Sequence, residues 1–312
     1  MKVEDVAKMD VKDRFIYWIK ERHQIHLKRQ AGMDAPWTDD EVLQSNFFTN
    51  PYRENDRVTI WFRENIRDPL KDEDDVLFAT VAFRWFNKPD PTGEILLDPR
   101  SNQGTVNGLC LLRQWDEEQA TELIREANNG GKQPVFTGAY MIKAGNGPPG
   151  CKIPNVCAAI TNVWNKRHWL VEVAQDSGTM EALHKELVKF PHLGGFMSYE
   201  VVCDLRYTSI FGPDGPSDVE TFSNLGPGAA RGLQRMNGIP INVPKSGMKD
   251  ARPKVDNWLE QFRELLAFTR KKLPRMPRFE LREIEHSLCE FDKYERIRLG
   301  EGRSKRKYNA RG

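Results

Sequence analysis

The sequence lacks the cysteine patterns that hold metals and clusters. Its 312 residues contain five cysteines, which are scattered and form no CxxC pair: Cys110, Cys151, Cys157, Cys203 and Cys289. This spacing does not support a zinc ribbon or an iron–sulfur loop. An odd number of scattered cysteines fits reduced thiols in a cytosolic compartment. The sequence therefore gives no indication of a metal or a cofactor.

The sequence also lacks long hydrophobic runs and a large net charge of either sign. No run approaches the roughly 20 apolar residues of a membrane span. The N-terminus is charged from Lys2 onward and has no apolar core of signal-peptide length. We therefore expect a soluble intracellular protein. Its 47 Lys and Arg stand against 45 Asp and Glu, for a net charge of +2, so the overall charge does not demand a polyanionic partner.

The C-terminal segment 293–312 departs from this balance, because it holds eight Lys or Arg against two Glu. It is either a solvated tail or an arm that contacts phosphate. In the second case Arg303, Lys305 and Arg306 are the candidate DNA-binding residues.

Helical periodicity covers most of the chain, and strand patterns are scarce. The positions of apolar residues predict helices over 11–30, 54–65, 74–86, 115–127, 155–173, 180–189, 255–272 and 283–299. Thr38 with Glu41 reads as a capping box that starts a further short helix, and 87–106 reads as a loop. We predict a mainly α-helical fold with long loops, in a single domain over 1–312.

Two glycine turns lie close together in the stretch 190–238. Leu193-Gly194-Gly195 precedes a helix predicted over 196–206, and Gly226-Pro227-Gly228 precedes one predicted over 229–236. A glycine turn at a helix N-terminus offers unpaired N–H groups and the positive end of the helix dipole to an anion. Asp218 lies between the turns. The pattern favours chemistry on a phosphate-bearing substrate, although both turns could be ordinary helix starts.

The stretch FPHLGGFMSY at 190–199 resembles the hairpin of helix–hairpin–helix DNA glycosylases. In that superfamily a tight glycine turn between two helices binds the DNA backbone through amides, and a later acidic residue faces a flipped nucleotide. The resemblance implies a glycosylase-like core at about 179–238. In it, Leu193, Gly194 and Gly195 would bind DNA, and Asp218 would be the acidic residue.

Two departures limit that resemblance. Met197 stands where bifunctional glycosylase-lyases have a Lys, so Schiff-base chemistry is not implied there. The iron–sulfur cysteines of the superfamily are also absent. Asp214 and Asp204 are weaker alternatives to Asp218, because Asp204 would lie within the helix.

Three further blocks resemble a narrower family. They are ERHQIHLKRQAG with PWTDDEVLQSNFFTNPYRENDR at 21–57, GPGAARGL at 226–233 after Asp218-x-x-Thr221, and LCEFDKY with GEGRSKRKY at 288–308. In this order they are similar to the phage α-glutamyl/putrescinyl-thymine pyrophosphorylases, also called amino acid:DNA transferases. The same helical domain is fused to some 5-hydroxymethyluracil DNA kinases. The similarity spans nearly the whole chain.

The resemblance implies a part in thymidine hypermodification of phage DNA. A partner kinase phosphorylates or pyrophosphorylates 5-hydroxymethyluracil in the DNA. The transferase then replaces that phosphate with the α-amine of an amino acid such as glycine, serine or glutamate. The implied partners are double-stranded phage DNA with modified uracil, a free amino acid and, functionally, a 5-hydroxymethyluracil DNA kinase. The implied location is the host cytoplasm, with no membrane.

The family's chemistry assigns roles to particular residues. Base flipping would give the reaction a closed pocket, and Asp218 would act as general base or orient the ammonium of the amino acid. Gly226, Gly228 and Arg231 would hold the leaving phosphate.

The remaining candidates each have a structural alternative. Arg53, or else Arg63, could clamp the carboxylate of the amino acid, or Arg53 could form an ion pair with Asp56. Lys293 and Tyr294 could line the site, or belong to a helix face with surface ion pairs.

Two other functions stay open at this point. The first is a monofunctional DNA glycosylase in which Asp218 activates water. The second is a non-catalytic DNA-binding helical module that partners a kinase. Only the transferase hypothesis accounts for the second glycine turn with Arg231.

Overall fold

The regular structure of this protein is helical. The computed structural model describes residues 3–98, 110–139, 141–142, 144–145, 147–148, 150–241 and 257–303, and within these ranges it contains helices and no strand. The predicted mainly α-helical class is therefore confirmed. None of the described helices is long and apolar enough to cross a membrane.

The chain divides into two units. Unit 1 comprises Met1–Asp56 and Val219–Gly312, and unit 2 comprises Arg57–Asp218. The two glycine turns therefore belong to different units, because the boundary falls between Asp218 and Val219. That the units act together as one domain stays a prediction.

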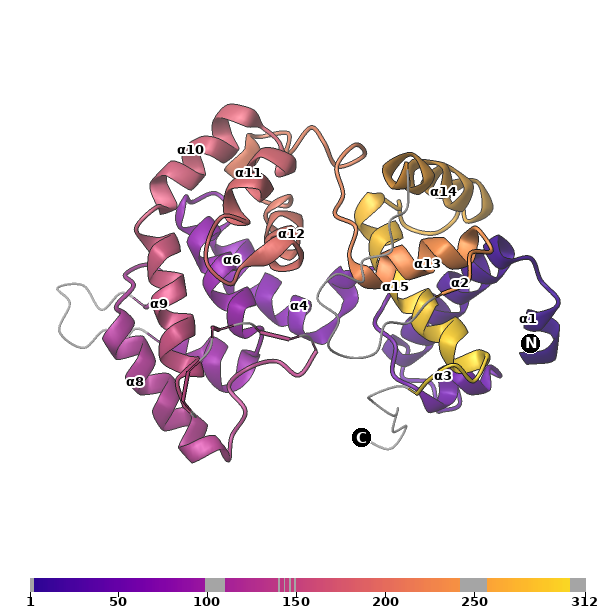
Figure 1. Ribbon diagram of the computed structural model, residues 1–312, viewed down its shortest axis with the longest axis horizontal. Coiled ribbons are helices and arrows are strands. Elements are labelled where there is room, and N and C mark those ends of the chain that lie inside the picture. The colour runs from indigo at the N-terminus through magenta and orange to yellow at the C-terminus, as the bar shows by residue number, and fades with distance from the viewer. Residues whose placement is uncertain are drawn as a thin grey trace. The chain divides into compact units, whose positions relative to one another are not determined.

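Unit 1 is built around its last helix. Its helices are α1 Val3–Ala7, α2 Val11–Gln30, α3 Glu41–Ser45, α13 Pro227–Met236, α14 Trp258–Lys272 and α15 Leu281–Arg298, with a 3₁₀ turn at Arg53–Asn55. Helix α15 contacts α2, α3, α13 and α14, and Figure 1 shows α13 and α15 side by side. The buried aromatic and aliphatic residues of these helices, such as Phe15, Phe262 and Leu288, form the core of unit 1.

The start of α3 differs from the prediction. The N-cap is Asp40, whose Oδ1 accepts the N–H groups of Val42 and Leu43 at 2.9 and 3.1 Å. Thr38, the predicted cap, instead donates its hydroxyl to Glu21 and accepts the N–H of Asp40. The prediction was wrong because Asp40 stands directly before the first helical residue, which is where a capping oxygen reaches the first turn.

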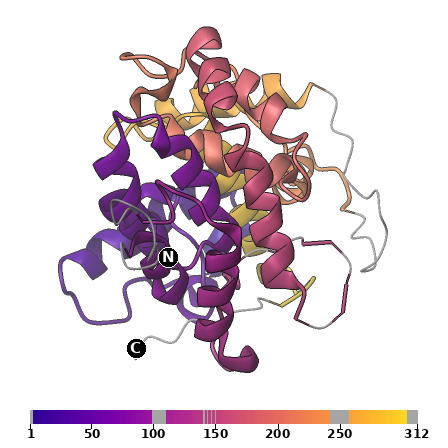
Figure 2. The ribbon, with the colours of Figure 1, turned by 90° about the vertical axis from the view of Figure 1, so that its left-hand side faces the viewer.

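Unit 2 is a cluster of helices around α6. Its α-helices are α4 Arg57–Phe62, α5 Asp68–Leu70, α6 Asp75–Phe86, α7 Glu94–Leu97, α8 Glu117–Asn128, α9 Lys152–Trp164, α10 Arg167–Ser177, α11 Met180–Leu187 and α12 Gly194–Leu205. Helix α6 is buried from Val76 to Phe86 and contacts α9, α10 and α12. Figure 2 shows unit 2 from the side that carries α8, α9 and α10.

Three segments, two in unit 2 and one across the boundary of the units, are more broken than their patterns predict. The helix predicted over 155–173 is two helices, α9 and α10, which meet at Asn165 and Lys166. The helix predicted over 54–65 becomes a 3₁₀ turn, α4 and a π-helical turn at Arg63–Arg67. The predicted loop 87–106 contains a π-helical turn at Pro89–Gly93 and α7, and its residues 99–106 lie outside the described ranges.

A buried ion pair joins two helices of unit 2. Arg84 on α6 donates from Nε and Nη2 to the two carboxylate oxygens of Asp204 on α12, at 2.5 and 3.0 Å. The guanidinium also donates to Asn87 and lies over the Phe62 ring. Burying a charge is costly unless a partner compensates it, so α6 and α12 depend on one another.

We expect Asp204→Asn to destabilise the protein by about 3–5 kcal/mol, because it leaves the Arg84 charge buried without its counter-charge. Urea unfolding followed by circular dichroism measures this change. The matched control is Glu73→Gln, which removes one partner of the exposed Arg113–Glu73 pair and should cost at most about 1 kcal/mol. Equal losses in the two variants would contradict this account.

Candidate functional site

The three sequence blocks that carry the transferase resemblance come together in unit 1, on helix α15. Thr49, from the N-terminal block, is hydrogen-bonded through Oγ1 to His286 Nε2 at 2.7 Å. The Thr49 N–H donates to Glu290 Oε2 at 3.0 Å. The partners in these two contacts are 237 and 241 residues apart in sequence. The imidazole of His286 thus meets the Thr49 hydroxyl, and the Glu290 carboxylate meets the Thr49 backbone N–H. An imidazole and a carboxylate are both groups that can accept a proton.

Lys293 ties the aromatic segment next to Thr49 to the same helix. Its Nζ donates to the carbonyl oxygen of Phe47, lies 3.3 Å from Glu290 Oε2 and lies 4.6 Å from the centre of the Phe48 ring. The predicted substrate-binding Lys293 is therefore part of the cluster Thr49–His286–Glu290–Lys293, which we call the α15 cluster. Its binding role stays a prediction.

The second glycine turn begins α13, and its glycines let α13 approach α15 closely. A Cβ on Gly228 would overlap Cys289 Sγ, and one on Gly232 would overlap the carbonyl of Leu288. A Cβ on Gly226 would lie 3.0 Å from Glu285 Oε1. The structure thus gives these glycines a packing role. A phosphate held at this N-terminus, as predicted for Gly226 and Gly228, would have the Glu285 carboxylate close by.

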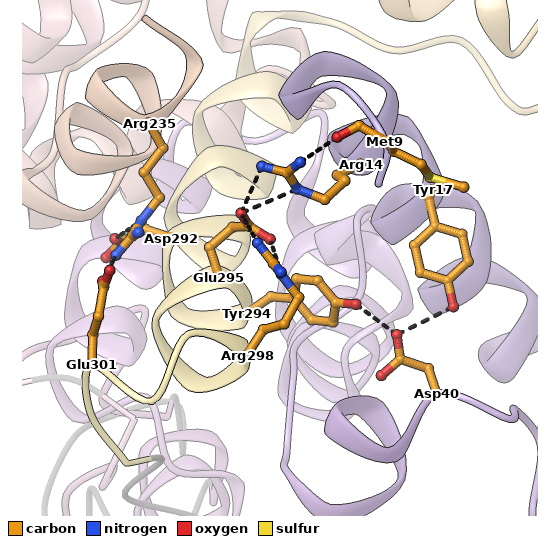
Figure 3. A network of polar contacts seen from close by, with 10 residues as sticks. All are labelled: Met9, Arg14, Tyr17, Asp40, Arg235, Asp292, Tyr294, Glu295, Arg298 and Glu301. Atoms are coloured by element: carbon orange, nitrogen blue, oxygen red, sulfur yellow. Dashed lines mark hydrogen bonds and ion pairs between the residues drawn. The ribbon is translucent and has the colours of Figure 1, made fainter. Parts of the chain in front are cut away.

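Arg231 lies on α13 and is directed at α15. Its Nε donates to Asp292 Oδ2 at 2.8 Å, and Arg235 donates to the other oxygen of Asp292 at 2.9 Å. Arg235 also reaches Glu301, as Figure 3 shows. The side chain of Arg231 keeps 26% of its surface exposed, whereas Asp292 keeps 2%. A leaving phosphate at Arg231 would share the guanidinium with Asp292.

Tyr294 is buried, and Figure 3 shows its hydroxyl directed at Asp40. Its hydroxyl donates to Asp40 Oδ2 at 2.6 Å, and Tyr17 donates to the same atom at 3.2 Å. Burial, followed by the negative charge of Asp40, raises the pKa of both phenols well above the ordinary value. Tyr294 therefore stays protonated and holds Asp40. Its predicted place in a substrate site is not tested by this geometry.

Arg53, the predicted carboxylate clamp, is half-buried in the 3₁₀ turn of unit 1. The neighbouring Asp56 accepts the backbone N–H and side-chain amide of Asn50 at 3.0 and 2.9 Å. Burial raises the pKa of Asp56, and the charge of Arg53 opposes that shift. Arg53 thus acts electrostatically on Asp56, and its role as a carboxylate clamp stays a prediction.

Asp218 lies in unit 2 and holds the start of α11. Its Oδ1 accepts the N–H of Met180 at 2.8 Å, and its Oδ2 accepts the N–H of Glu181 at 2.9 Å. Thr179 caps the same helix by accepting the N–H of Ala182. Asp218 therefore has a structural function, and its catalytic role stays a prediction.

The first glycine turn connects α11 to α12, which contact each other within unit 2. Leu193 is buried, Gly194 has a φ of +61°, and no side chain caps the start of α12. His184 on α11 places Nε2 at 3.0 Å from the Gly195 carbonyl, and burial lowers the pKa of this imidazole. Two helices joined by a glycine turn, with no side chain capping the start of the second helix, are compatible with the hairpin that the resemblance implies. DNA binding there stays a prediction.

The sequence reasoning missed several residues of the α15 cluster. Thr49, His286 and Glu290 were not singled out, because nothing in the sequence shows that they meet. The EHSLCEF stretch was the available signal, since it places His286 and Glu290 four residues apart on one side of a helix. Arg303 is exposed, and the predicted DNA-binding Lys305 and Arg306 lie outside the described residues.

We expect Asp218→Asn to lower stability by about 1–3 kcal/mol, because an amide offers one oxygen where two N–H groups need acceptors. Amide hydrogen exchange at Met180 and Glu181 localises the loss. Thr179→Ala is the matched control, since it weakens the cap of the same helix by about 1 kcal/mol and leaves Asp218 in place. Unchanged protection of both amides in Asp218→Asn would contradict the capping role.

Comparison with known proteins found a matching family and a curated relative. The model of a family described as "5-hmdU DNA kinase, helical domain" matches residues 9–304. A curated relative, the 5-hmdU DNA kinase of Bacillus phage SP10, is 28% identical over an alignment of 238 residues, and the match covers 71% of this chain and 35% of the relative. The chain thus spans about a third of that relative's length. No solved structure matches. Because the family match covers nearly all of its residues, this chain belongs to the family of 5-hmdU DNA kinase helical domains.

Proposed function

We propose that this protein is an amino acid:DNA transferase that acts in thymidine hypermodification. It replaces the phosphate of 5-phosphomethyl-deoxyuridine in phage DNA with the α-amine of an amino acid. One observation carries the proposal: residues from the first and second blocks of the transferase resemblance each contact the third block on α15 of unit 1, and the partners are up to 241 residues apart. Membership in a family named for 5-hmdU DNA kinases supports the substrate class.

The reaction needs a proton acceptor and stabilisation of an anion. The amine nitrogen forms a bond to the exocyclic methylene carbon, the carbon–oxygen bond to phosphate breaks, and the amine gives up one proton. Displacement can be direct, or phosphate can leave first and the amine then add to an exocyclic methylene. In either route the α15 cluster supplies His286 and Glu290 as proton acceptors. Asp218 stays a second candidate for that role.

Cations next to the α15 cluster suit the phosphate once it has left the base. Lys293 contacts Glu290 directly, and Arg231 is partly exposed on the helix that packs against α15. Charge-assisted hydrogen bonds from such groups to phosphate are stronger than neutral ones. The glycine turn at Leu193–Gly195, together with Arg303, Lys305 and Arg306, would hold the DNA backbone, which fixes position without reading sequence.

A second candidate function has one specific observation in its favour. The chain matches 35% of the length of a whole kinase, so a helical module of this kind can accompany a kinase that performs the chemistry. The protein would then bind DNA and bring the kinase to it. A monofunctional DNA glycosylase has no comparable support from the geometry of unit 1.

The test uses duplex DNA containing 5-phosphomethyl-deoxyuridine and each of the twenty amino acids. We expect phosphate release that requires both the modified duplex and one amino acid, and mass spectrometry should find that amino acid attached to the thymidine. His286→Gln should slow release about 10²–10⁴-fold, the usual contribution of a general base. His168→Gln, on the exposed surface of α10, serves as the control and should leave the rate unchanged.

Each alternative gives a different result in the same assay. A glycosylase releases free base and leaves abasic sites, with no need for an amino acid. A non-catalytic module binds the duplex but releases neither phosphate nor base. Either outcome would overturn the transferase proposal.

A further inference from the structure

A cavity of about 510 Å³ opens in unit 1, between the second half of α2 and the segments on either side of α3. Arg22, Arg29, Trp37, Gln44, Phe47 and Phe48 are among the residues that line it. All of its lining residues belong to the N-terminal block of the transferase resemblance. Cavities of roughly 300–1,000 Å³ with apolar walls and a few polar groups are the usual form of small-ligand sites.

The charge of the cavity is positive. Two arginines line it, and none of the described lining residues is acidic. Arg22 is 7% exposed, and its Nε donates to the Phe48 carbonyl at 3.0 Å, which fixes the guanidinium at the wall. The guanidinium carbon of Arg29 lies 5.3 Å from the centre of the Trp37 ring. Arginine held in place in this way suits a phosphate or carboxylate, because its fork of donors matches their oxygens.

Aromatic rings form much of the remaining wall, and hydrogen bonds hold one of them in place. Trp37 donates its Nε1–H to the Met33 carbonyl at 2.6 Å, and its own carbonyl accepts Lys28 Nζ at 2.7 Å. Phe48 is 3% exposed and meets the Trp18 ring edge-on. Fixed aromatic rings beside cations are the groups on which proteins stack extruded bases.

We propose that this cavity receives the 5-phosphomethyl-pyrimidine of the DNA substrate, with the ring against Trp37 and Phe47 and the phosphate toward Arg22 and Arg29. The inference rests on the proposed transferase function and assigns its base pocket. Size and charge favour a base over the amino acid. A lone amino acid would leave most of the volume empty, and none of the described lining residues supplies a carboxylate to hold its ammonium.

The wall of the cavity continues directly into the α15 cluster. The Phe47 carbonyl accepts Lys293, the Phe48 ring lies under Lys293, and Thr49 contacts His286 and Glu290. One short segment, 47–49, therefore contributes both to the base pocket and to the proton-accepting groups. This continuity places the reacting methylene of a bound base on the same part of unit 1 as the groups that would act on it.

The experiment measures binding by fluorescence anisotropy with three probes. They are a labelled duplex with one 5-phosphomethyl-deoxyuridine, the same duplex with thymidine, and the free 5-phosphomethyl nucleoside as competitor. The variants are Arg29→Gln and Trp37→Leu, both at positions that are not fully buried, and the matched control is Arg275→Gln, an exposed arginine of unit 1. Thermal unfolding confirms that each variant is folded, and Arg29→Lys supplies a milder change.

We expect the wild-type protein to bind the phosphomethyl duplex at least about tenfold more tightly than the thymidine duplex, as a phosphate meeting fixed arginines would give. Arg29→Gln and Trp37→Leu should bring the ratio of the two affinities close to one without weakening the binding of the thymidine duplex. Arg29→Lys should retain part of the preference for the phosphomethyl duplex. Arg275→Gln should keep the full ratio.

Several outcomes would overturn the pocket. The first is an unchanged ratio of affinities for the two duplexes in both variants. The second is a wild-type protein that does not prefer the phosphomethyl duplex. The third is tight binding of the free nucleoside without any binding of the duplex. The transferase proposal fails separately. If the two variants lose the preference for the phosphomethyl duplex but no amino acid gives phosphate release, the pocket is supported and the transferase is rejected. If both variants turn over normally, the transferase is supported and the pocket is rejected.

Discussion

Unit 1 depends on the compensation of three buried carboxylates. Asp40, Asp292 and Glu295 are each at most 2% exposed, and a buried charge is tolerated only when it is paired and hydrogen-bonded. Side chains from α2, α13 and α15 compensate them. Figure 3 shows Tyr17 and Tyr294 at Asp40, Arg235 at Asp292, and Arg14 and Arg298 at Glu295. Arg231 donates to the other oxygen of Asp292. These contacts fix the first part of the chain and α13 against α15, and the packing of Gly228 and Gly232 then brings α13 close.

The candidate site follows from that arrangement. Once Asp40 is held by Tyr294, the segment after α3 runs along α15, and Thr49 meets His286 and Glu290. The carbonyl and ring contacts of Lys293 hold Phe47 and Phe48 in the same way. The cavity wall and the α15 cluster therefore both depend on one network of buried charges. In unit 2 the buried Arg84–Asp204 ion pair has a similar structural role, because it joins α6 to α12, the helix that follows the first glycine turn.

The sequence predicted the helical class and many helix positions, and it could not predict most contacts of the site. Helix α2 has the predicted bounds because its apolar stripe runs without a break from Phe15 to Ile25. The break between α9 and α10 was missed, since no Gly or Pro marks it and the apolar period continues into Leu170 and Val171. The C-terminal block covers the part of α15 that holds Glu290, Asp292 and Lys293, and their roles in a site stay predictions. The His286–Thr49 contact, or the capping of α11 by Asp218, depends on residues far apart in sequence, and periodicity carries no information about such pairs.

The central claim is that unit 1 recognises the phosphorylated base while the glycine turn of unit 2 holds the DNA backbone. Hydrogen exchange with mass spectrometry tests it most directly, by comparing the free protein with its complexes of thymidine and 5-phosphomethyl-deoxyuridine duplexes. Both duplexes should protect the backbone amides of the turn at Leu193–Gly195 from exchange. Only the phosphorylated duplex should add protection over 22–48 and 286–293. Phosphate-dependent protection confined to unit 2 would contradict the account.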